Sequence, residues 1–521
     1  MNKHLDVVFI NIGNTSKSYQ TLINEFAAIE PPIWALMLAA SAQKHGLSVD
    51  IIDGDAERLS PQEIATRIKT LKPTLTVVVV YGHNPSASTQ LIPSAQEVCN
   101  AICNQTPDQD VLLVGGHIAA LPIKSLEEIQ ATYACGGEGF ATIPALVKAL
   151  QSKKKKTNDV PDLYSNTPQG YMILPNAKKR APLADINKEI TDLPWYLLPM
   201  QNYKAHNWHC FANPDNRQPY GTLYTSLGCP YNCYFCCIQA PFRSGERVSN
   251  YKSSSYRLFD PEYVLSQIDT LVTEYGVSNI KIADELFLCN REHVKAICDG
   301  IIDRNYDLNM WIYARSNVIC NTDLLPLMKK AGMNWFGIGI ESGNSKILES
   351  ISKKTKVDTS REAAHKLRNE GIYMATSWIF GLPEDTHDSM EDTLSLAHEL
   401  NTEFVNFHCA AAYPGSKLYI EAKEKGWPLP KTWGGYAQFS KDFIPLPTKY
   451  LDGLEVLKFR DAAWQEYYSE NNTAYRAMMK TTFGPHIIDH LNRMTKIKLE
   501  RTYLNDSQHD PTGTVHSKLT N

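Results

Sequence analysis

Short apolar runs alternate with stretches of helical periodicity along the first 150 residues of the chain. Apolar runs of strand length predict buried strands, and apolar residues at helical spacing predict amphipathic helices between them. This alternation favours an α/β fold with a doubly wound, Rossmann- or flavodoxin-like parallel sheet. The predicted strands are Val7–Ile10, Ser48–Ile52, Leu75–Tyr81, Val111–Val114 and Tyr133–Cys135. The predicted helices are Pro32–His45, Pro61–Leu71, Ser94–Asn104, Ile123–Glu128 and Ala141–Gln151.

The same alternation resumes between residues 221 and 419. It predicts a partial (β/α)6 TIM-type barrel, in which right-handed crossovers bring the carboxyl ends of all strands to one mouth. The predicted strands are Thr222–Thr225, Ile280–Ala283, Asn309–Tyr313, Trp335–Ile340, Tyr373–Phe380 and Val405–Ala411. The predicted helices are Pro261–Tyr275, Arg291–Arg304, Thr322–Ala331, Asn344–Ser350, Ser360–Gly371 and His387–Leu400.

A chain of 521 residues exceeds the size that one hydrophobic core supports. We divide it into an α/β domain (1–150), a connector rich in Pro, Asn and Lys (151–215), the partial barrel (216–425), a small and mainly helical region rich in aromatic residues (426–504) and a polar tail expected to be disordered (505–521).

Composition narrows the class of protein only a little. Apolar residues make up 43% and charged residues 21% of the chain, and the net charge is −4, all ordinary for a globular protein. The one basic run, Lys153–Lys156, is typical of a solvated linker, so we expect no nucleic-acid partner. Neither a signal peptide nor an apolar run long enough to span a bilayer is visible, which predicts a cytoplasmic protein without a membrane span.

The strongest chemical signal is a cysteine loop that follows the first barrel strand. Cys229, Cys233 and Cys236 are spaced C-x3-C-x2-C. Three thiolates on one tight loop can hold three corners of a [4Fe-4S] cluster and leave the fourth iron open for chemistry. Structural zinc is the rival, but it needs four ligands, commonly as two C-x2-C pairs, and no second pair is visible. Cys237 is expected not to be a ligand, because adjacent side chains point apart.

With Phe235 just before the third cysteine, this loop resembles the signature of radical S-adenosylmethionine (SAM) enzymes. The resemblance implies that the open iron binds the amino and carboxylate groups of SAM. It also implies that one electron from the cluster cleaves SAM to methionine and a 5'-deoxyadenosyl radical.

Residues at the predicted barrel mouth are candidates for SAM binding. Asp284 and Glu285 offer acceptors for the SAM ammonium group, and Arg315, with Ser316 beside it, offers a guanidinium for a carboxylate. Glu341 is a candidate for a ribose hydroxyl. Ile379 and Gly381 match the family's I-x-G-x-x-E pattern, whose strand is expected to flank adenine.

Glycines and polar residues also follow the strands of the N-terminal sheet, where ligands of such sheets bind. Together with the cysteine loop, the Pro31–Ala40 stretch and these strand ends resemble the cobalamin-binding domain of cobalamin-dependent radical SAM enzymes. The cobalamin-binding candidates are Asn11, Tyr81, Gly82, Gly115, Gly116, His117, Gly137 and Glu138. The D-x-H-x-x-G motif, whose His would bind cobalt from below, is absent, so a degenerate domain without cofactor stays open.

The expected function is therefore that of a radical SAM enzyme with three cofactors: a [4Fe-4S] cluster, SAM and cobalamin. We expect a C-methyltransferase in which methylcobalamin methylates a carbon radical of a small-molecule substrate, with flavodoxin or ferredoxin as electron donor. One alternative is an oxidative cyclase or rearrangement enzyme, because the C-terminal half, including Tyr413–Tyr419, also resembles the anaerobic magnesium-protoporphyrin monomethyl ester cyclase group. A non-catalytic cobalamin sensor is the other alternative.

Overall fold

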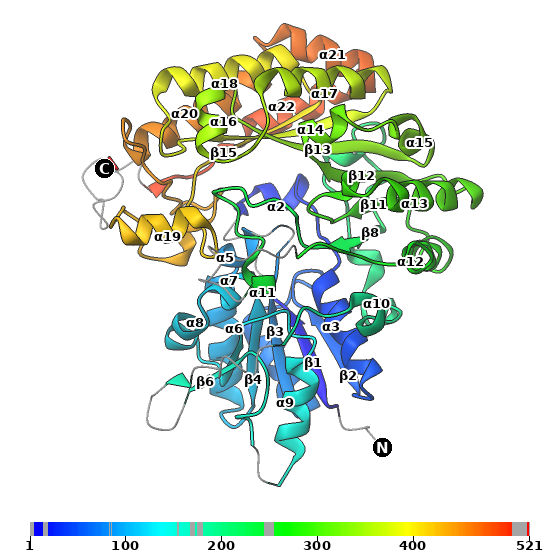
Figure 1. The fold of residues 1–521 in the computed structure, drawn as a ribbon, viewed down its shortest axis with the longest axis vertical. Coiled ribbons are helices and arrows are strands. Elements are labelled where there is room, and N and C mark those ends of the chain that lie inside the picture. Colours follow the sequence, from blue (N-terminus) through cyan, green and yellow to red (C-terminus); the bar gives the residue numbers. More distant parts are fainter. Residues whose placement is uncertain are drawn as a thin grey trace.

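Two parallel sheets form the frame of the molecule, the N-terminal one in blue and cyan and the barrel sheet in green and yellow (Figure 1). The structure is a computed structural model that describes residues 5–13, 19–82, 84, 86–153, 156–166, 172–173, 181–243, 255–502 and 518–519.

The N-terminal sheet has the strand order β2-β1-β3-β4-β5-β6-β7. Its first five strands are parallel and follow the flavodoxin-like order 2-1-3-4-5, which confirms the predicted doubly wound sheet. The strands are β1 Val7–Asn11, β2 Val49–Asp53, β3 Leu75–Val80, β4 Val111–Gly115, β5 Tyr133–Cys135, β6 Leu163–Asn166 and β7 Met172–Ile173. The helices are α2 Leu22–Glu25, α3 Ile33–Lys44, α4 Pro61–Leu71, α5 Ala87–Gln90, α6 Ile92–Gln105, α7 Gly116–Ala120, α8 Pro122–Glu128 and α9 Thr142–Gln151.

Burial explains why the strands of this sheet are continuous apolar runs. Every residue of β3 and β4 is buried, as expected for a parallel sheet with helices on both faces. Antiparallel β6 and β7 extend the sheet past residue 150, into the segment that the sequence predicted as connector.

The barrel sheet has the order β15-β14-β13-β12-β11-β8, and all its strands are parallel. β8 and β15 are its two edges, so the barrel is open, as predicted. The strands are β8 Tyr220–Leu223, β11 Asn279–Ile282, β12 Asn309–Ala314, β13 Met333–Glu341, β14 Tyr373–Phe380 and β15 Phe404–Cys409, and a separate ribbon pairs β9 Ser226–Leu227 with β10 Arg257–Leu258. The helices are α11 Ala240–Arg243, α12 Pro261–Thr273, η6 Phe287–Cys289, α13 Arg291–Asp303, α14 Ser316–Cys320, α15 Leu325–Lys330, α16 Ser345–Ser350, α17 Val357–Asn369, α18 His387–Leu400 and α19 Lys417–Glu424.

The connector carries a large aromatic residue to the amino-terminal end of the barrel. It contains α10 Ile186–Glu189 and the short helices η2 Trp195–Leu197, η3 Met200–Asn202 and η4 Trp208–Cys210. The Trp208 ring packs against Trp311, Trp335 and Phe404, which belong to β12, β13 and β15. Trp208 therefore closes the bottom of the barrel and leaves the chemistry to the opposite end.

The C-terminal region covers the edge strand β15. It comprises η7 Trp433–Tyr436, α20 Gly453–Tyr468, α21 Thr473–Phe483 and α22 His486–Lys496. Three buried tyrosines bond the backbone at the start of this strand. Tyr468 donates to and accepts from Val405 of β15, and Tyr467 and Tyr475 donate to the carbonyls of Thr402 and Glu403 just before it. These contacts satisfy groups that an open sheet edge would expose.

Among the described helices, none has the length and apolar character that crossing a bilayer requires. The tail predicted as disordered lies outside the described residues, except for residues 518–519. There Leu519 is buried and donates its backbone N–H to the Thr448 carbonyl.

We predict that Tyr468→Phe destabilises the fold by about 1–3 kcal/mol, because the buried N–H and C=O of Val405 both lose their partner. Each lies 2.8 Å from the Tyr468 hydroxyl. Denaturant unfolding measures the effect. Tyr450→Phe is the control, since Tyr450 is 51% exposed, and its free energy of unfolding should stay near that of the wild type. Equal stabilities for all three proteins would contradict the assigned edge contact.

Candidate active site

The cysteine loop begins directly after β9 and is held by its own polar contacts. Gly228 has a φ of +82°, and a Cβ at this position would lie 2.4 Å from the Ser255 carbonyl oxygen, so only glycine fits. The Ser255 hydroxyl accepts the Cys229 N–H at 3.3 Å and donates to Gln239 Oε1 at 2.7 Å. The Gln239 amide donates in turn to the Cys229 carbonyl at 2.8 Å. The chain thus shapes this loop with its own groups.

The three spaced cysteines share one environment. Cys229, Cys233 and Cys236 are free and partly exposed, whereas Cys237 is buried. Burial raises the pKa of Cys229 to about 11. Burial also raises the pKa of Cys236 well above its usual value, and the nearby thiols Cys237 and Cys233 raise it further. Arg315 Nη1 lies 3.3 Å from Cys233 Sγ, so a cation stands beside the trio.

This donor set fits an iron–sulfur cluster better than a single ion. Among the described residues, no three His, Cys, Asp or Glu side chains converge on one point as a single-ion site requires. A cubane attaches each thiolate to a different iron, so its ligands need not converge. Three free thiols on one loop, near a guanidinium that offsets thiolate charge, match that requirement. Raised thiol pKa values mean that cluster binding would release protons.

Alternate residues of the barrel strands face its interior. Trp311 donates to the Tyr220 hydroxyl at 2.9 Å, and the Lys281 ammonium lies 5.0 Å from the Trp311 ring centre. Tyr220, Lys281 and Trp311 therefore share the inner face of β8, β11 and β12. The two-residue period of a strand places Thr222 on the same face, nearer the mouth. Tyr224, Ala283 and Glu285 follow the carboxyl ends of β8 and β11.

Two neighbouring carboxylates at the end of β11 have different surroundings. Asp284 is buried and accepts hydrogen bonds of 2.6 Å from the Thr225 N–H and from the hydroxyls of Thr225 and Ser226. Glu285 has one buried oxygen, Oε2, without a partner among the described residues. Burial raises the pKa of Asp284 to about 6, and burial together with the charge of Asp284 raises the pKa of Glu285 to about 8. Asp284 thus ties β11 to the start of the cysteine loop, and Glu285 keeps a free acceptor.

Arg315 and Ser316 lie side by side in sequence but have separate contacts. The Arg315 guanidinium stacks 4.0 Å from the Tyr231 ring centre and donates to the Lys353 carbonyl, so it braces the cysteine loop. The Ser316 hydroxyl is buried and lies 3.2 Å from the Ser360 hydroxyl.

Glu341 sits in strained backbone at the end of β13. Its φ is +71°, a region that costs a residue with a side chain about 1–3 kcal/mol and that recurs at functional sites. Its carboxylate forms an ion pair with Lys353, with Glu341 Oε1 2.5 Å from Lys353 Nζ. A Cβ at Gly339 would meet both of these groups. The neighbouring β14 supplies Ile379, which packs on the same small cluster as Phe235 of the cysteine loop. Gly381 directly follows β14, and a Cβ there would meet Val456 of α20.

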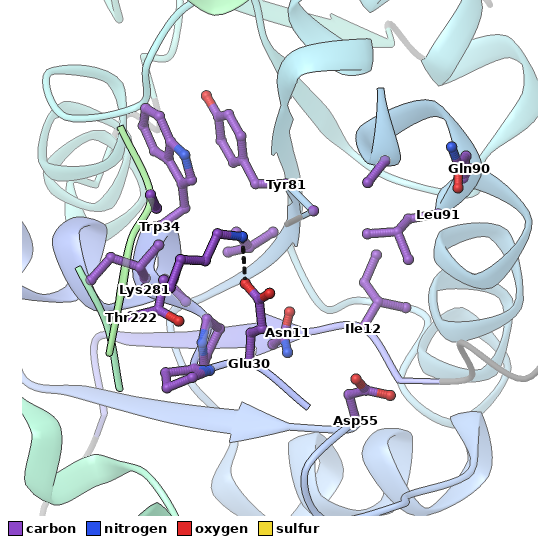
Figure 2. Close-up of a pocket in the computed structure, with 18 of the residues that line it drawn as sticks. Asn11, Ile12, Glu30, Trp34, Asp55, Tyr81, Gln90, Leu91, Thr222 and Lys281 are labelled. Atoms are coloured by element: carbon purple, nitrogen blue, oxygen red, sulfur yellow. Dashed lines mark hydrogen bonds and ion pairs between the residues drawn. The ribbon is translucent and has the colours of Figure 1, made fainter. Parts of the chain in front are cut away.

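A partly open cavity lies between the two sheets (Figure 2). The N-terminal sheet lines it at the ends of β1, β2 and β3, and the barrel lines it with inner-face residues of β8 and β11. This position is the β1/β3 switch point, where doubly wound sheets bind their ligands. The residues that line the cavity include Asn11, Glu30, Trp34, Tyr81, Gly82, Thr222, Tyr224 and Lys281.

Three of the cobalamin candidates, Asn11, Tyr81 and Gly82, line this cavity. Tyr81 stacks on Trp34 with ring centres 4.0 Å apart and an angle of 4°. Its buried hydroxyl has no partner among the described residues. The other five candidates, Gly115, Gly116, His117, Gly137 and Glu138, lie outside the described lining.

Those five have other contacts. A Cβ at Gly115 would lie 2.2 Å from the Val80 carbonyl oxygen, so the neighbouring strand requires glycine there. His117 is buried edge-on against Trp433, and burial lowers its pKa to about 3, which keeps the imidazole neutral. Glu138 pairs with Arg257 of β10. Whether these residues contact cobalamin stays a prediction.

A buried ion pair joins the domains at the cavity wall. Lys281 Nζ lies 2.8 Å from Glu30 Oε2, with the side chains 1% and 4% exposed (Figure 2). His206 of the connector lies 3.6 Å from the other Glu30 oxygen. Neither this pair nor Lys353 was predicted from the sequence; a Lys between two isoleucines of a strand is the signal that could have found Lys281.

Comparison with known families identifies both domains. The sequence pattern of the radical SAM superfamily matches residues 223–397, and that of the B12 binding domain matches residues 19–147. The chain is 27% identical over 443 residues to an uncharacterized methyltransferase of Pyrococcus horikoshii, covering 84% of this chain and 88% of that protein. It is 25% identical over 406 residues to the anaerobic magnesium-protoporphyrin IX monomethyl ester cyclase of Rubrivivax gelatinosus, covering 77% of this chain and 68% of that protein.

Solved structures share the fold. The radical SAM methyltransferase TsrM of Kitasatospora setae, with cobalamin and a [4Fe-4S] cluster bound, superposes with a TM-score of 0.64 at 16% identity, covering 90% of each chain.

We predict that replacing Cys229, Cys233 and Cys236 together by Ala abolishes cluster binding. After anaerobic reconstitution, iron and sulfide should fall from about four each per chain to background, because no thiolate is left to ligate iron. Cys237→Ala is the matched control and should keep its iron, since Cys237 is buried. Iron retained by the triple variant would rule out this loop as the cluster site.

We also predict that Lys281→Met destabilises the cofactor-free protein by about 3–5 kcal/mol, because it leaves the buried Glu30 carboxylate without its ammonium partner. Thermal and denaturant unfolding measure this. Lys295→Met removes an exposed ion pair with Asp299 and should cost less than about 1 kcal/mol. A comparable small loss in both variants would mean that the Lys281–Glu30 pair is not desolvated.

Proposed function

We propose that this chain, which combines a radical SAM domain with a B12 binding domain, is a C-methyltransferase that acts on an unactivated carbon of a small molecule. Its methyltransferase relatives and its TsrM-like fold support the proposal. The proposed cofactors are a [4Fe-4S] cluster, SAM and cobalamin.

The observation that carries the proposal is the cavity shared by the two sheets. Strand ends of the B12 binding domain and inner-face residues of the barrel line the same space. A substrate held there can face SAM on one side and cobalamin on the other, which methyl transfer between the two domains requires. When bound, the cluster supplies the electron that cleaves SAM, and the corrin supplies a methyl carrier.

The residues of the chain hold and orient these groups. Cys229, Cys233 and Cys236 would ligate the cluster, and Arg315 fixes the Cys233 side of the loop through its 3.3 Å contact. The unpartnered Glu285 oxygen is the proposed acceptor for the SAM ammonium group. Asp284 acts on the same site indirectly, by holding Thr225 and Ser226.

The remaining predicted contacts are proposed with the geometry described above. Glu341 is the proposed contact for a ribose hydroxyl, and Ile379 and Gly381, at and just after the end of β14, are the proposed contacts for adenine. Asn11, Tyr81 and Gly82 are the proposed cobalamin contacts, since they line the cavity. Trp208 closes the far end of the barrel and helps to exclude water from the radical.

A one-electron carrier, flavodoxin or ferredoxin, is the proposed reductant of the cluster, and a reducing cytoplasm is the proposed location. The oxidative cyclase reaction is the second candidate, favoured by the match to the Rubrivivax cyclase over 77% of this chain.

The test uses anaerobically reconstituted protein, a strong reductant and SAM labelled with a deuterated methyl group. A small-molecule extract of cells that lack the protein serves as substrate source. We expect 5'-deoxyadenosine, S-adenosylhomocysteine and a product heavier by one CD3 group, all absent with the Cys229, Cys233 and Cys236 triple Ala variant. Mass spectrometry measures all three.

The outcomes separate the candidates. Deoxyadenosine with an altered product that carries no CD3 would favour the cyclase reaction. Methyl transfer without bound cobalt would overturn the role of cobalamin. Bound cobalt without any cleavage of SAM would point to the non-catalytic sensor.

A further inference from the structure

A bidentate ion pair connects the loop after β5 to the strand beside the cysteine loop. Glu138 Oε1 lies 2.5 Å from Arg257 Nη2, and Glu138 Oε2 lies 3.2 Å from Arg257 Nη1. The side chains are 7% and 17% exposed, so water screens the pair poorly. Arg257 belongs to β10 and pairs in register with Leu227 of β9, two residues before Cys229. The B12 binding domain is thus tied to the base of the cysteine loop.

The connector also contacts the Glu138–Arg257 ion pair. The Ala184 N–H of the connector donates to Glu138 Oε2 at 3.1 Å, and Arg257 Nη1 donates to the Ala184 carbonyl at 2.8 Å. The guanidinium also lies 5.5 Å from the Phe242 ring centre, and Phe242 packs 6.3 Å from Trp34 of the cavity wall. Three parts of the chain therefore meet at one charged contact next to the cavity.

The geometry of the Glu138–Arg257 pair is suited to holding two chain segments in a fixed orientation. A fork-to-fork Arg–carboxylate pair is planar and directional, so it fixes orientation as well as distance. A buried ion pair adds little net stability compared with apolar packing, so its role here is better sought in what it aligns. It aligns the Gly136–Gly139 loop of the B12 binding domain with the cysteine loop, which is the proposed cluster site.

We propose that Glu138 and Arg257 are positioning residues that set the spacing between the B12 binding domain and the cysteine loop. Transfer of the SAM methyl group between the domains depends on this spacing, whereas reductive cleavage of SAM, confined to the barrel, does not. The expected effect on methyl transfer rests on the proposed methyltransferase function, whereas the mechanical coupling of the two loops does not.

The first test needs no cofactor. Hydrogen–deuterium exchange compares the wild type with Glu138→Gln and Arg257→Gln. We expect Arg257→Gln to speed exchange in the segment 136–140, and Glu138→Gln to speed exchange in 226–229, each by about tenfold or more. Glu399→Gln is the matched control, because it breaks a bidentate Arg–Glu pair with Arg361 that is about half exposed on the outside of the barrel. It should leave both segments unchanged. Faster exchange only around the substituted residue would overturn the coupling.

The second test measures both fates of SAM in reconstituted protein with cobalamin and titanium(III) citrate. In methyl transfer, cobalamin reduced by titanium(III) would accept the SAM methyl group, and the sulfonium of SAM would become the thioether of S-adenosylhomocysteine. In cleavage, one electron from titanium(III), passed through the cluster, would yield methionine and a 5'-deoxyadenosyl radical, which takes a hydrogen atom from substrate or buffer to become 5'-deoxyadenosine. We expect both Gln variants to lower S-adenosylhomocysteine formation by about 10–100-fold, with deoxyadenosine within about twofold of the wild type. An equal loss of both products would overturn the positioning role.

Arg257→Lys covers the case in which the Gln variants fail to fold. It keeps the positive charge but cannot form the bidentate hydrogen bonds of the guanidinium. We expect less S-adenosylhomocysteine and unchanged 5'-deoxyadenosine. Wild-type amounts of both products would count against the proposal. If the wild type itself makes no S-adenosylhomocysteine, the proposed function fails, and the exchange experiment alone still decides whether the pair couples the loops.

Discussion

Two parallel sheets direct the carboxyl ends of their strands toward one cavity, and the rest of the structure depends on that arrangement. Parallel strands need long crossover connections, and their helices cover the sheet faces, so the strand ends are where side chains stay open to ligands. Here the strand ends of the N-terminal sheet meet inner-face positions of β8 and β11. One of the lining strands, β8, is an edge of the open barrel. Chemistry that needs two large cofactors at one substrate carbon has a physical basis in this geometry.

The contacts that hold the domains together are polar and buried. Lys281–Glu30 crosses the cavity wall, and Glu138–Arg257 crosses beside the cysteine loop. Apolar packing alone tolerates sliding of one surface over another, whereas an ion pair cut off from water requires its partners at a fixed distance. The two buried ion pairs therefore help to fix how the domains are oriented relative to each other.

Hydrogen bonds distinguish the polar groups at the barrel mouth that hold the fold together from those that are left to bind a ligand. Asp284 has its oxygens engaged by Thr225 and Ser226, although its place in the sequence beside Glu285 suggested equal roles. Glu285 Oε2 and the Tyr81 hydroxyl are buried without described partners, an arrangement that costs free energy unless a ligand completes it. The backbone strain at Glu341 points to the same end of the barrel.

The sequence by itself determined the two α/β units, nearly all their long strands and helices, and the cysteine loop. Those features depend on local periodicity and on close spacing along the chain, which one sequence contains. Short elements such as α14, which begins at Ser316, were not predicted, because so few residues show no hydrophobic periodicity. Only the tertiary structure decided that Asn11, Tyr81 and Gly82 face the cavity while His117 packs against Trp433, and that Lys281 finds Glu30 some 250 residues away. Which polar group is engaged and which is left open depends on partners that folding brings together, and spacing in the sequence does not encode those distances.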